Sequence, residues 1–192
     1  TSSDGGASWS QPVNVSNTAA LTDASVLYDR NGDGSGLANY PGDSGKATVF
    51  AAGKNLVITW DDTYCGDGIH GPAEYKGALG MIEVPYHCLY AARATVSSGN
   101  IKLIAVDRLT DGTRDVKNEM ARGTGAGFAL SWQEDPEGLQ LGEARGEGHG
   151  ASGAKVTEGT DVWYAWIKGS EFADSAKSWR GPVPITDNFD YD

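Results

Sequence analysis

The sequence has few of the signals that mark α-helices, and it is poor in cysteine, histidine and basic residues. Its 27 Gly and 7 Pro are interleaved with β-branched and aromatic residues, which favours short strands joined by turns over a disordered linker. No run of about 18 apolar residues occurs, so no segment is predicted to span a bilayer. The composition therefore predicts an all-β fold.

Basic residues are also scarce relative to acidic ones. The 26 Asp and Glu against 15 Lys and Arg give a formal net charge of −11, which repels nucleic acid and anionic membrane surfaces. No nucleophile motif of the Gly-x-Ser-x-Gly kind, no phosphate loop and no dinucleotide fingerprint occurs, and the glycine-rich stretches 123–127 and 148–153 are interpreted as loops. The charge argues against a polyanionic partner, whereas acidic turns suit divalent cations.

Only two cysteines are present, Cys65 and Cys88. We expect them to form a disulfide, which closes a loop of about two dozen residues and contributes roughly 3 kcal/mol to stability. Such a bond implies an oxidising compartment, so the protein is predicted to be extracellular, on a cell surface or periplasmic. The alternative is a pair of separate buried thiols, which the spacing does not exclude.

Internal similarity organises the chain. Residues 55–62 resemble 127–134, because each is an apolar strand that ends in a hydroxyl residue, Trp and then acidic or amide residues; residues 88–92 line up with 162–166. Residues 8–17 mirror 178–187. The first and the last segments of the given sequence therefore correspond to the same part of a repeat of seventy-odd residues.

Enrichment in β-branched and aromatic residues between Gly, Asn and Asp predicts four strands in each repeat. We expect strands at 46–51, 55–61, 87–95 and 101–107, then at 116–121, 126–133, 161–168 and 181–186, with residues 12–16 forming the last strand of an earlier unit. Tandem four-stranded antiparallel units are typical of a β-propeller.

A family resemblance supports this interpretation. Residues 2–9, Ser-Ser-Asp-Gly-Gly-Ala-Ser-Trp, fit the pattern Ser-x-Asp-x-Gly-x-x-Trp at every fixed position, Ser2, Asp4, Gly6 and Trp9. The segment resembles the Asp box of sialidase-like β-propellers of bacterial secreted or surface type. In such a turn the Asp accepts backbone N–H bonds, the Gly supplies a permissive backbone and the Trp packs under the turn.

The second copy of this segment is less complete. It keeps Trp179 and the following Pro182-Val183, but Glu171-Phe172-Ala173-Asp174 does not fit the pattern. We expect this copy to have lost the aspartate and the glycine.

The resemblance implies a propeller of four-stranded antiparallel blades, with about two full blades at 45–110 and 115–187 and the end of a preceding blade at 1–17. In this family the Asp box is structural and lies away from the ligand face. The long loops 17–45, 62–86 and 134–160 would then gather on the opposite face, where such folds place function. Two blades do not close a ring, so the chain is predicted to be a piece of a larger protein whose other blades lie in the parent chain or in other subunits.

A calcium-loop pattern lies in the first long loop, at residues 29–35, Asp-Arg-Asn-Gly-Asp-Gly-Ser. Oxygen ligands on alternate residues converge on one ion where Gly permits a tight turn. The predicted ligands are the side chains of Asp29, Asn31 and Asp33, the carbonyl of Ser35, and Asp43. The alternative is an Asp/Asn/Gly turn that holds no ion.

Two weaker candidates lie in or beside the same loops. The three histidines, His70, His87 and His149, could form a copper or zinc site, although surface or hydrogen-bonding histidines are the commoner case. The acidic pairs 61–62 and 134–135 follow the second strands and could serve as acid and base in glycoside hydrolysis. Solvated strand ends or further calcium ligands are the favoured interpretation of these pairs.

The sequence thus predicts a secreted calcium-binding propeller module that binds or scaffolds a glycan or protein partner through long loops on one face. The alternatives are a sialidase-like glycoside hydrolase and a copper- or zinc-dependent periplasmic oxidoreductase. A third is a purely structural assembly in which blades from separate chains join. The arginines are scattered and no Arg-Ile-Pro motif occurs, so no catalytic residue of sialidases is assigned.

Overall fold

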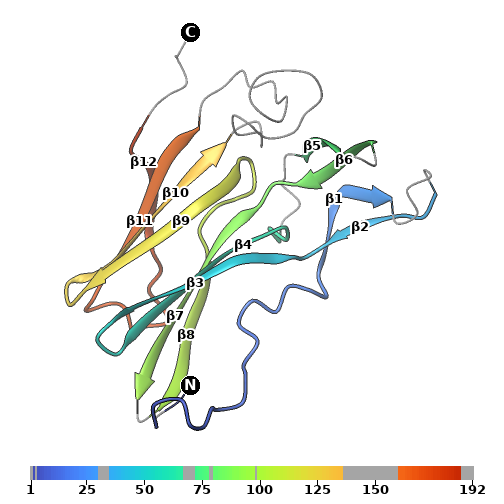
Figure 1. Ribbon diagram of the computed structural model, residues 1–192. Helices are drawn as coiled ribbons and strands as arrows, with labels where there is room; N and C mark the ends of the chain where they lie inside the picture. Colours follow the sequence, from blue (N-terminus) through green and yellow to red (C-terminus); the bar gives the residue numbers. More distant parts are fainter. Residues whose placement is uncertain are drawn as a thin grey trace.

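The computed structural model of the protein describes residues 2, 4–29, 35–66, 72–77, 80–97, 99–135 and 160–186. Within these ranges the regular structure consists of β-strands that pair antiparallel, with no helix (Figure 1). The described residues likewise include no helix with the length and apolar character needed to cross a membrane. The all-β class predicted from composition is confirmed.

Eight strands form two four-stranded sheets. The first sheet consists of β3 (Ser44–Ala52), β4 (Asn55–Asp62), β7 (Cys88–Ser97) and β8 (Asn100–Arg108), hydrogen-bonded in that order. The second sheet consists of β9 (Asp115–Thr124), β10 (Gly127–Asp135), β11 (Asp161–Lys168) and β12 (Arg180–Pro184), again in sequence order. Each predicted strand of the two repeats overlaps one of these strands.

The remaining strands form two hairpins inside predicted loops. In the 17–45 loop, β1 (Thr22–Asp29) pairs with β2 (Leu37–Pro41); in the 62–86 loop, β5 (Pro72–Gly77) pairs with β6 (Gly80–Pro85). These connections therefore carry strands that the sequence analysis did not predict. The predicted strand at 12–16 is wrong, because these residues pair with no strand and Val13 is 75% exposed.

Because the strands alternate in direction, the connections separate to two ends of the sheets. The turns β3–β4, β7–β8 and β9–β10 and the β11–β12 connection lie at one end, which we call the turn end. The chain between β4 and β7, between β8 and β9, and between β10 and β11 leaves from the other, which we call the loop end. The expectation that the long connections share one end holds for both sheets.

One apolar core joins the two sheets. Val57, Leu89 and Ala91 of the first sheet belong to the same buried cluster as Phe128, Leu130, Trp132, Ala165 and Ile167 of the second. The closest backbone approaches follow β9, whose Cα atoms come within 8 Å of β3, β4 and β7. We call the sheet faces that meet at this core the inner faces and the opposite ones the outer faces.

The strand register fixes which residues of the two repeats are equivalent. Ile58 lies opposite Ala92 in the first sheet, and Leu130 lies opposite Ala165 in the second. Ala92 therefore corresponds to Ala165, whereas the sequence comparison aligned it with Trp166. A slip of one residue transfers every side chain of a strand to the other face, so this correction decides which faces are equivalent.

A buried arginine fastens the turn ends of the sheets together. Arg93 of β7 is fully buried, and its Nη1 donates to the carbonyls of Phe172 at 3.0 Å and Asp174 at 3.2 Å. Its Nη2 donates to the carbonyl of Lys177, and its Nε donates to Asp107 Oδ2 at 3.2 Å. A buried charge is tolerated when it is paired and hydrogen-bonded in this way, so one side chain of the first sheet holds the β11–β12 connection of the second.

Candidate functional site

Residues 2–9, which the sequence predicts to be an Asp box, form a hydrogen-bonded turn. Asp4 Oδ1 accepts the backbone N–H of Ser8 at 3.0 Å, and Ser2 Oγ accepts that of Gly6 at 2.7 Å. Hydrogen bonds from Ser8 and Ser2 hold the pKa of Asp4 well below its usual range, and Gly6 has a φ of 97°, which glycine adopts without strain. Trp9 does not pack into a core, because it is 72% exposed.

The second copy of this turn retains its aspartate, contrary to the sequence analysis. Asp174 lies five residues before Trp179, as Asp4 lies five before Trp9, and its Oδ1 accepts the N–H of Ala176 at 2.9 Å. Trp179 is only 7% exposed and belongs to the shared core. The stretch equivalent to residues 2–9 is 172–179, one residue later than the stretch beginning at Glu171.

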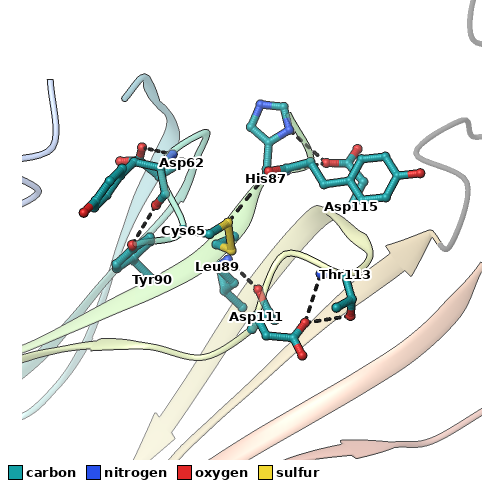
Figure 2. The surroundings of a disulfide bond; sticks show 12 residues. Asp62, Cys65, His87, Leu89, Tyr90, Asp111, Thr113 and Asp115 are labelled. Atoms are coloured by element: carbon teal, nitrogen blue, oxygen red, sulfur yellow. Dashed lines mark hydrogen bonds and ion pairs between the residues drawn. A yellow bond between two sulfur atoms is a disulfide. The ribbon is translucent and has the colours of Figure 1, made fainter. Parts of the chain in front are cut away.

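The predicted disulfide between Cys65 and Cys88 is present, with 23 residues of sequence separation, and both residues are buried. It ties the segment after β4 to the start of β7 at the loop end of the first sheet. Figure 2 shows its surroundings, with Asp62 and Tyr90 on one side and His87 and Asp115 on the other.

The acid at the end of β4 is a structural hub. Asp62 is fully buried; its Oδ2 accepts hydrogen bonds from Thr18 Oγ1 and Ser44 Oγ, each at 2.6 Å. Its Oδ1 accepts the N–H of Tyr64 at 3.0 Å. These bonds fasten three segments, so Asp62 supports the fold.

Of the three histidines, only His87 falls within the described residues. Its Nδ1 and its backbone nitrogen lie 2.9 and 2.7 Å from Asp115 Oδ1 (Figure 2). Burial by itself lowers the pKa of His87, but the hydrogen bond and charge of Asp115 outweigh this and raise it. His70 and His149 lie outside the described residues, where the predicted copper or zinc site cannot be placed.

Charged groups continue between the sheets beside His87. Lys46 Nζ lies 3.6 Å from Asp61 Oδ2, and Lys117 Nζ lies 3.5 Å from Asp115 Oδ2. Burial, reinforced by the charge of Asp61, raises the pKa of Glu119. The described part of the chain nevertheless contains no group of three or more His, Cys, Asp or Glu side chains arranged to hold a metal ion.

The predicted calcium loop at 29–35 lies mostly outside the described residues. Residues 30–34 are not among those described, and they include the predicted ligands Asn31 and Asp33. Of its other members, Ser35 and Asp43 are exposed. The backbone N–H of Asp43 donates to Thr63 Oγ1 at 2.8 Å, which places this residue beside the start of the β4–β7 connection. The calcium site stays a prediction.

A pocket of about 340 Å³ opens at the loop end, where the β8–β9 connection crosses the second sheet. Arg108, Leu109, Thr110, Asp111, Thr113 and Arg114 line one side, and Glu134, Trp163 and Pro182 line the other. The sequence analysis singled out Glu134 alone among these residues. Residues 109–114 lie between the predicted strands 101–107 and 116–121, and Asp-Gly-Thr at 111–113 is a turn signal that could have drawn attention to them.

The polar groups of the pocket hold one another in place. Glu134 is 7% exposed; its Oε1 accepts a bond from Trp132 Nε1 at 2.9 Å, and its Oε2 lies 3.8 Å from Arg114 Nη1. The Arg114 guanidinium lies 5.2 Å from the ring centre of Trp163, within cation–π range. Trp163 Nε1 is buried and has no hydrogen-bond partner among the described residues, so the wall presents an indole N–H that a ligand could use.

The two carboxyl groups of the pocket differ in their electrostatics. Burial raises the pKa of Glu134, and the bond from Trp132 and the charge of Arg114 offset this only in part. Asp111 accepts hydrogen bonds from Thr113 N at 3.0 Å and Thr113 Oγ1 at 2.7 Å (Figure 2). Partial burial raises the pKa of Asp111, but these bonds outweigh it and lower the pKa. Environments that separate two carboxyl pKa values mark candidate acid and base groups.

Comparisons of the chain with protein-family models, curated proteins and solved structures find no match. The class that the structure defines is therefore an all-β protein of two four-stranded antiparallel sheets that share one core and carry one disulfide.

Proposed function

We propose that this chain is an exported, Asp-box propeller-type module that binds a glycan in the pocket at the loop end. The observation that carries the proposal is the pocket wall, in which the buried carboxyl of Glu134, the guanidinium of Arg114 and the indole of Trp163 converge. Ligand sites typically combine an apolar surface with a few fixed polar groups.

The chemistry of a sugar matches this wall. A pyranose has apolar C–H faces that pack on indole and Pro rings, and its hydroxyls both donate and accept hydrogen bonds. Carboxylate and guanidinium groups bind pairs of neighbouring hydroxyls with both of their polar atoms. Asp111 and Arg108 line the same pocket, so donors and acceptors are available on the side opposite Trp163.

The wider assignment draws on separate features. Two four-stranded meanders in tandem and the hydrogen-bonded turn at Asp4 support the propeller, and the Cys65–Cys88 disulfide supports export. The calcium part of the proposal rests on the sequence pattern at 29–35. It predicts that Asp33→Ala lowers the melting temperature in calcium but not in chelator; equal shifts in both would remove the ion from the proposal.

The binding proposal is tested by glycan-array screening followed by calorimetric titration of the best sugar. Trp163→Ala is expected to weaken binding at least about tenfold, since it removes the stacking surface and its N–H. Trp9→Ala is the matched control, because this tryptophan is exposed and does not line the pocket. No bound sugar, or equal affinities of the Trp163 and Trp9 variants, would refute the proposal.

Glu134 and Asp111 line the same pocket, and the opposed pKa directions of their carboxyl groups favour a second candidate function, glycoside hydrolysis. Glu134 would protonate the leaving oxygen, and Asp111 would act as the carboxylate base or nucleophile. Turnover of aryl glycosides tests it: Glu134→Gln is expected to lower kcat by roughly 10²–10⁴-fold and to abolish the alkaline limb of the pH profile. If the unaltered chain binds a sugar but does not hydrolyse aryl glycosides, the hydrolase function is excluded and the binding function remains.

A further inference from the structure

The outer face of the first sheet corresponds to the inner face of the second. On β4, Leu56, Ile58 and Trp60 take the places that Phe128, Leu130 and Trp132 take on β10. Across the sheet, Ala92 corresponds to Ala165, as the register shows. The same face of the repeat is therefore apolar in both sheets.

This face is covered in the second sheet, whereas in the first sheet it is exposed along the two edge strands, β3 and β8, with Trp60 and Ala92 buried on the central strands between them. Ala121 of the second sheet is fully buried, whereas its equivalent in the first sheet, Val49, is 63% exposed. On β8 the same outer face exposes Ile101 by 46%, Leu103 by 42% and Val106 by 39%. Four exposed aliphatic residues therefore lie on the two edges of one sheet face, and exposed apolar surface of this kind marks interaction surfaces.

The chain itself shows what covers this face of the repeat. The inner face of the second sheet packs on the inner face of the first, to which Val57 and Ala91 contribute. In the second sheet the positions equivalent to Val57 and Thr59 are Ala129 and Ser131, which lie on its outer face. That outer face also carries Met120, 50% exposed, and a stacked pair of rings, Tyr164 and Trp166, 5.3 Å apart.

We propose that the outer face of the first sheet binds the outer face of the second sheet of another copy of this chain. The contact repeats, between copies, the packing that joins the two sheets within one copy. Two different faces meet, so the interface is heterologous, and successive copies form a closed ring or an open chain. In this contact, the small side chains of Ala129 and Ser131 in one copy lie against Ile58 and Val49 in the next copy. Within one copy, the equivalent residues Val57 and Thr59 face the second sheet in the same way. This inference does not depend on the glycan pocket, which lies on the inner side.

The test uses sedimentation equilibrium of the unaltered chain and three variants at 0.15 M salt and up to roughly 100 µM protein, well above a micromolar Kd. Val49→Lys places a charge on one proposed face and Met120→Lys on the other. Val13→Lys is the control, because Val13 is 75% exposed but lies outside both sheets. Each change adds one positive charge and so reduces the magnitude of the net charge of −11; added self-repulsion therefore does not explain a loss of association.

We expect the unaltered chain and Val13→Lys to associate and the other two variants to be monomeric. An equimolar mixture of Val49→Lys and Met120→Lys should form a dimer, because each partner keeps the face that the other lacks. A monomeric unaltered chain overturns the proposal. So does dissociation by Val13→Lys, or a mixture that stays monomeric while both variants retain the circular dichroism of the unaltered chain.

Discussion

The two four-stranded sheets share strand order and a repeated sequence, yet they use equivalent positions differently. In the first sheet, the loop end is fastened by the Cys65–Cys88 disulfide and by the bonds to Asp62. In the second sheet, the residue equivalent to Asp62 is Glu134, which lines the pocket. The comparison teaches that equivalent positions of one repeat can support the fold in one copy and line a pocket in the next, without a change of fold.

The turn ends show the reverse distribution. The β7–β8 connection of the first sheet is a short turn, whereas the β11–β12 connection buries Phe172 and Trp179 and is held by Arg93. The first sheet is therefore stabilised by these contacts at its loop end, and the second sheet at its turn end. Variants at these fastenings test the contrast.

The largest effect is expected from Arg93→Met. The change leaves the carbonyls of Phe172 and Asp174 and the carboxylate of Asp107 without their buried partner, which costs about 3–5 kcal/mol. Urea unfolding measures the loss, with Arg122→Met as the control, since Arg122 is exposed and its hydrogen bond within the described part of the chain goes to the carbonyl of Ala121. A loss no larger than that of the control would show that the two sheets hold together without the clamp.

Removal of the disulfide should have the next largest effect. The bond closes a segment with a sequence separation of 23, and its loss in Cys65→Ala/Cys88→Ala relaxes the unfolded chain, which lowers stability by about 2–4 kcal/mol. Unfolding of the double variant beside the unaltered chain, with and without reductant, provides the measurement. If reductant destabilised both proteins equally, the effect would not come from this bond.

The equivalent acids Asp62 and Glu134 should respond in opposite directions to loss of charge at pH 7. Asp62→Asn weakens the charged acceptor of two buried hydroxyls and is expected to lower stability by about 1.5–3 kcal/mol. Burial raises the pKa of Glu134 in the folded state, so its charged form costs stability above that pKa. Glu134→Gln should therefore hold or raise stability at pH 7.

The pH dependence of stability tests whether ionised Glu134 lowers the free energy of unfolding. A raised folded-state pKa means that the contribution of Glu134 is fully present below its unfolded pKa, roughly 4.3, and is lost as pH rises through the folded value. Unfolding titrations from pH 4 to pH 7 should therefore show a smaller decline for Glu134→Gln than for the unaltered chain. Identical pH profiles of the two proteins would contradict the electrostatic account of this side chain.

Much of the strand order could be predicted because hydroxyl-Trp-acid endings, at residues 59–62 and 131–134, mark the second strand of each sheet. The sheet face on which each side chain of the third strand lies could not be predicted. The sequence comparison of residues 88–92 with 162–166 carries no information on the register of strand pairing. The strand at 12–16 was predicted from its likeness to β12, but β12 is a strand because β11 pairs with it. Among the described residues, 12–16 have no such neighbouring strand, so their strand propensity does not suffice.

The site was harder to predict than the fold. Cys65 and Cys88 could be paired because the chain has no other cysteine. The pocket depends on the way in which 108–114 cross the second sheet, which brings Arg114 to Trp163 across some fifty residues of sequence. Arg93 was one of several scattered arginines, and only the packing of β7 against the β11–β12 connection distinguishes it.

The smallest effect is expected at the turn of residues 2–9, whose surroundings differ from those of its counterpart at residues 172–179. The carboxylate of Asp4 accepts the N–H of Ser8 in a turn whose residues 4–9 are exposed, so Asp4→Ala should leave the urea midpoint unchanged. It should instead speed the hydrogen exchange of the Ser8 amide, measured by NMR, because the turn opens locally without global unfolding. Asp174→Ala offers the matched comparison, since its turn is anchored by Arg93 and by the buried Trp179. A shift of the urea midpoint by Asp4→Ala as large as that by Asp174→Ala would show that the exposed copy is coupled to the core after all.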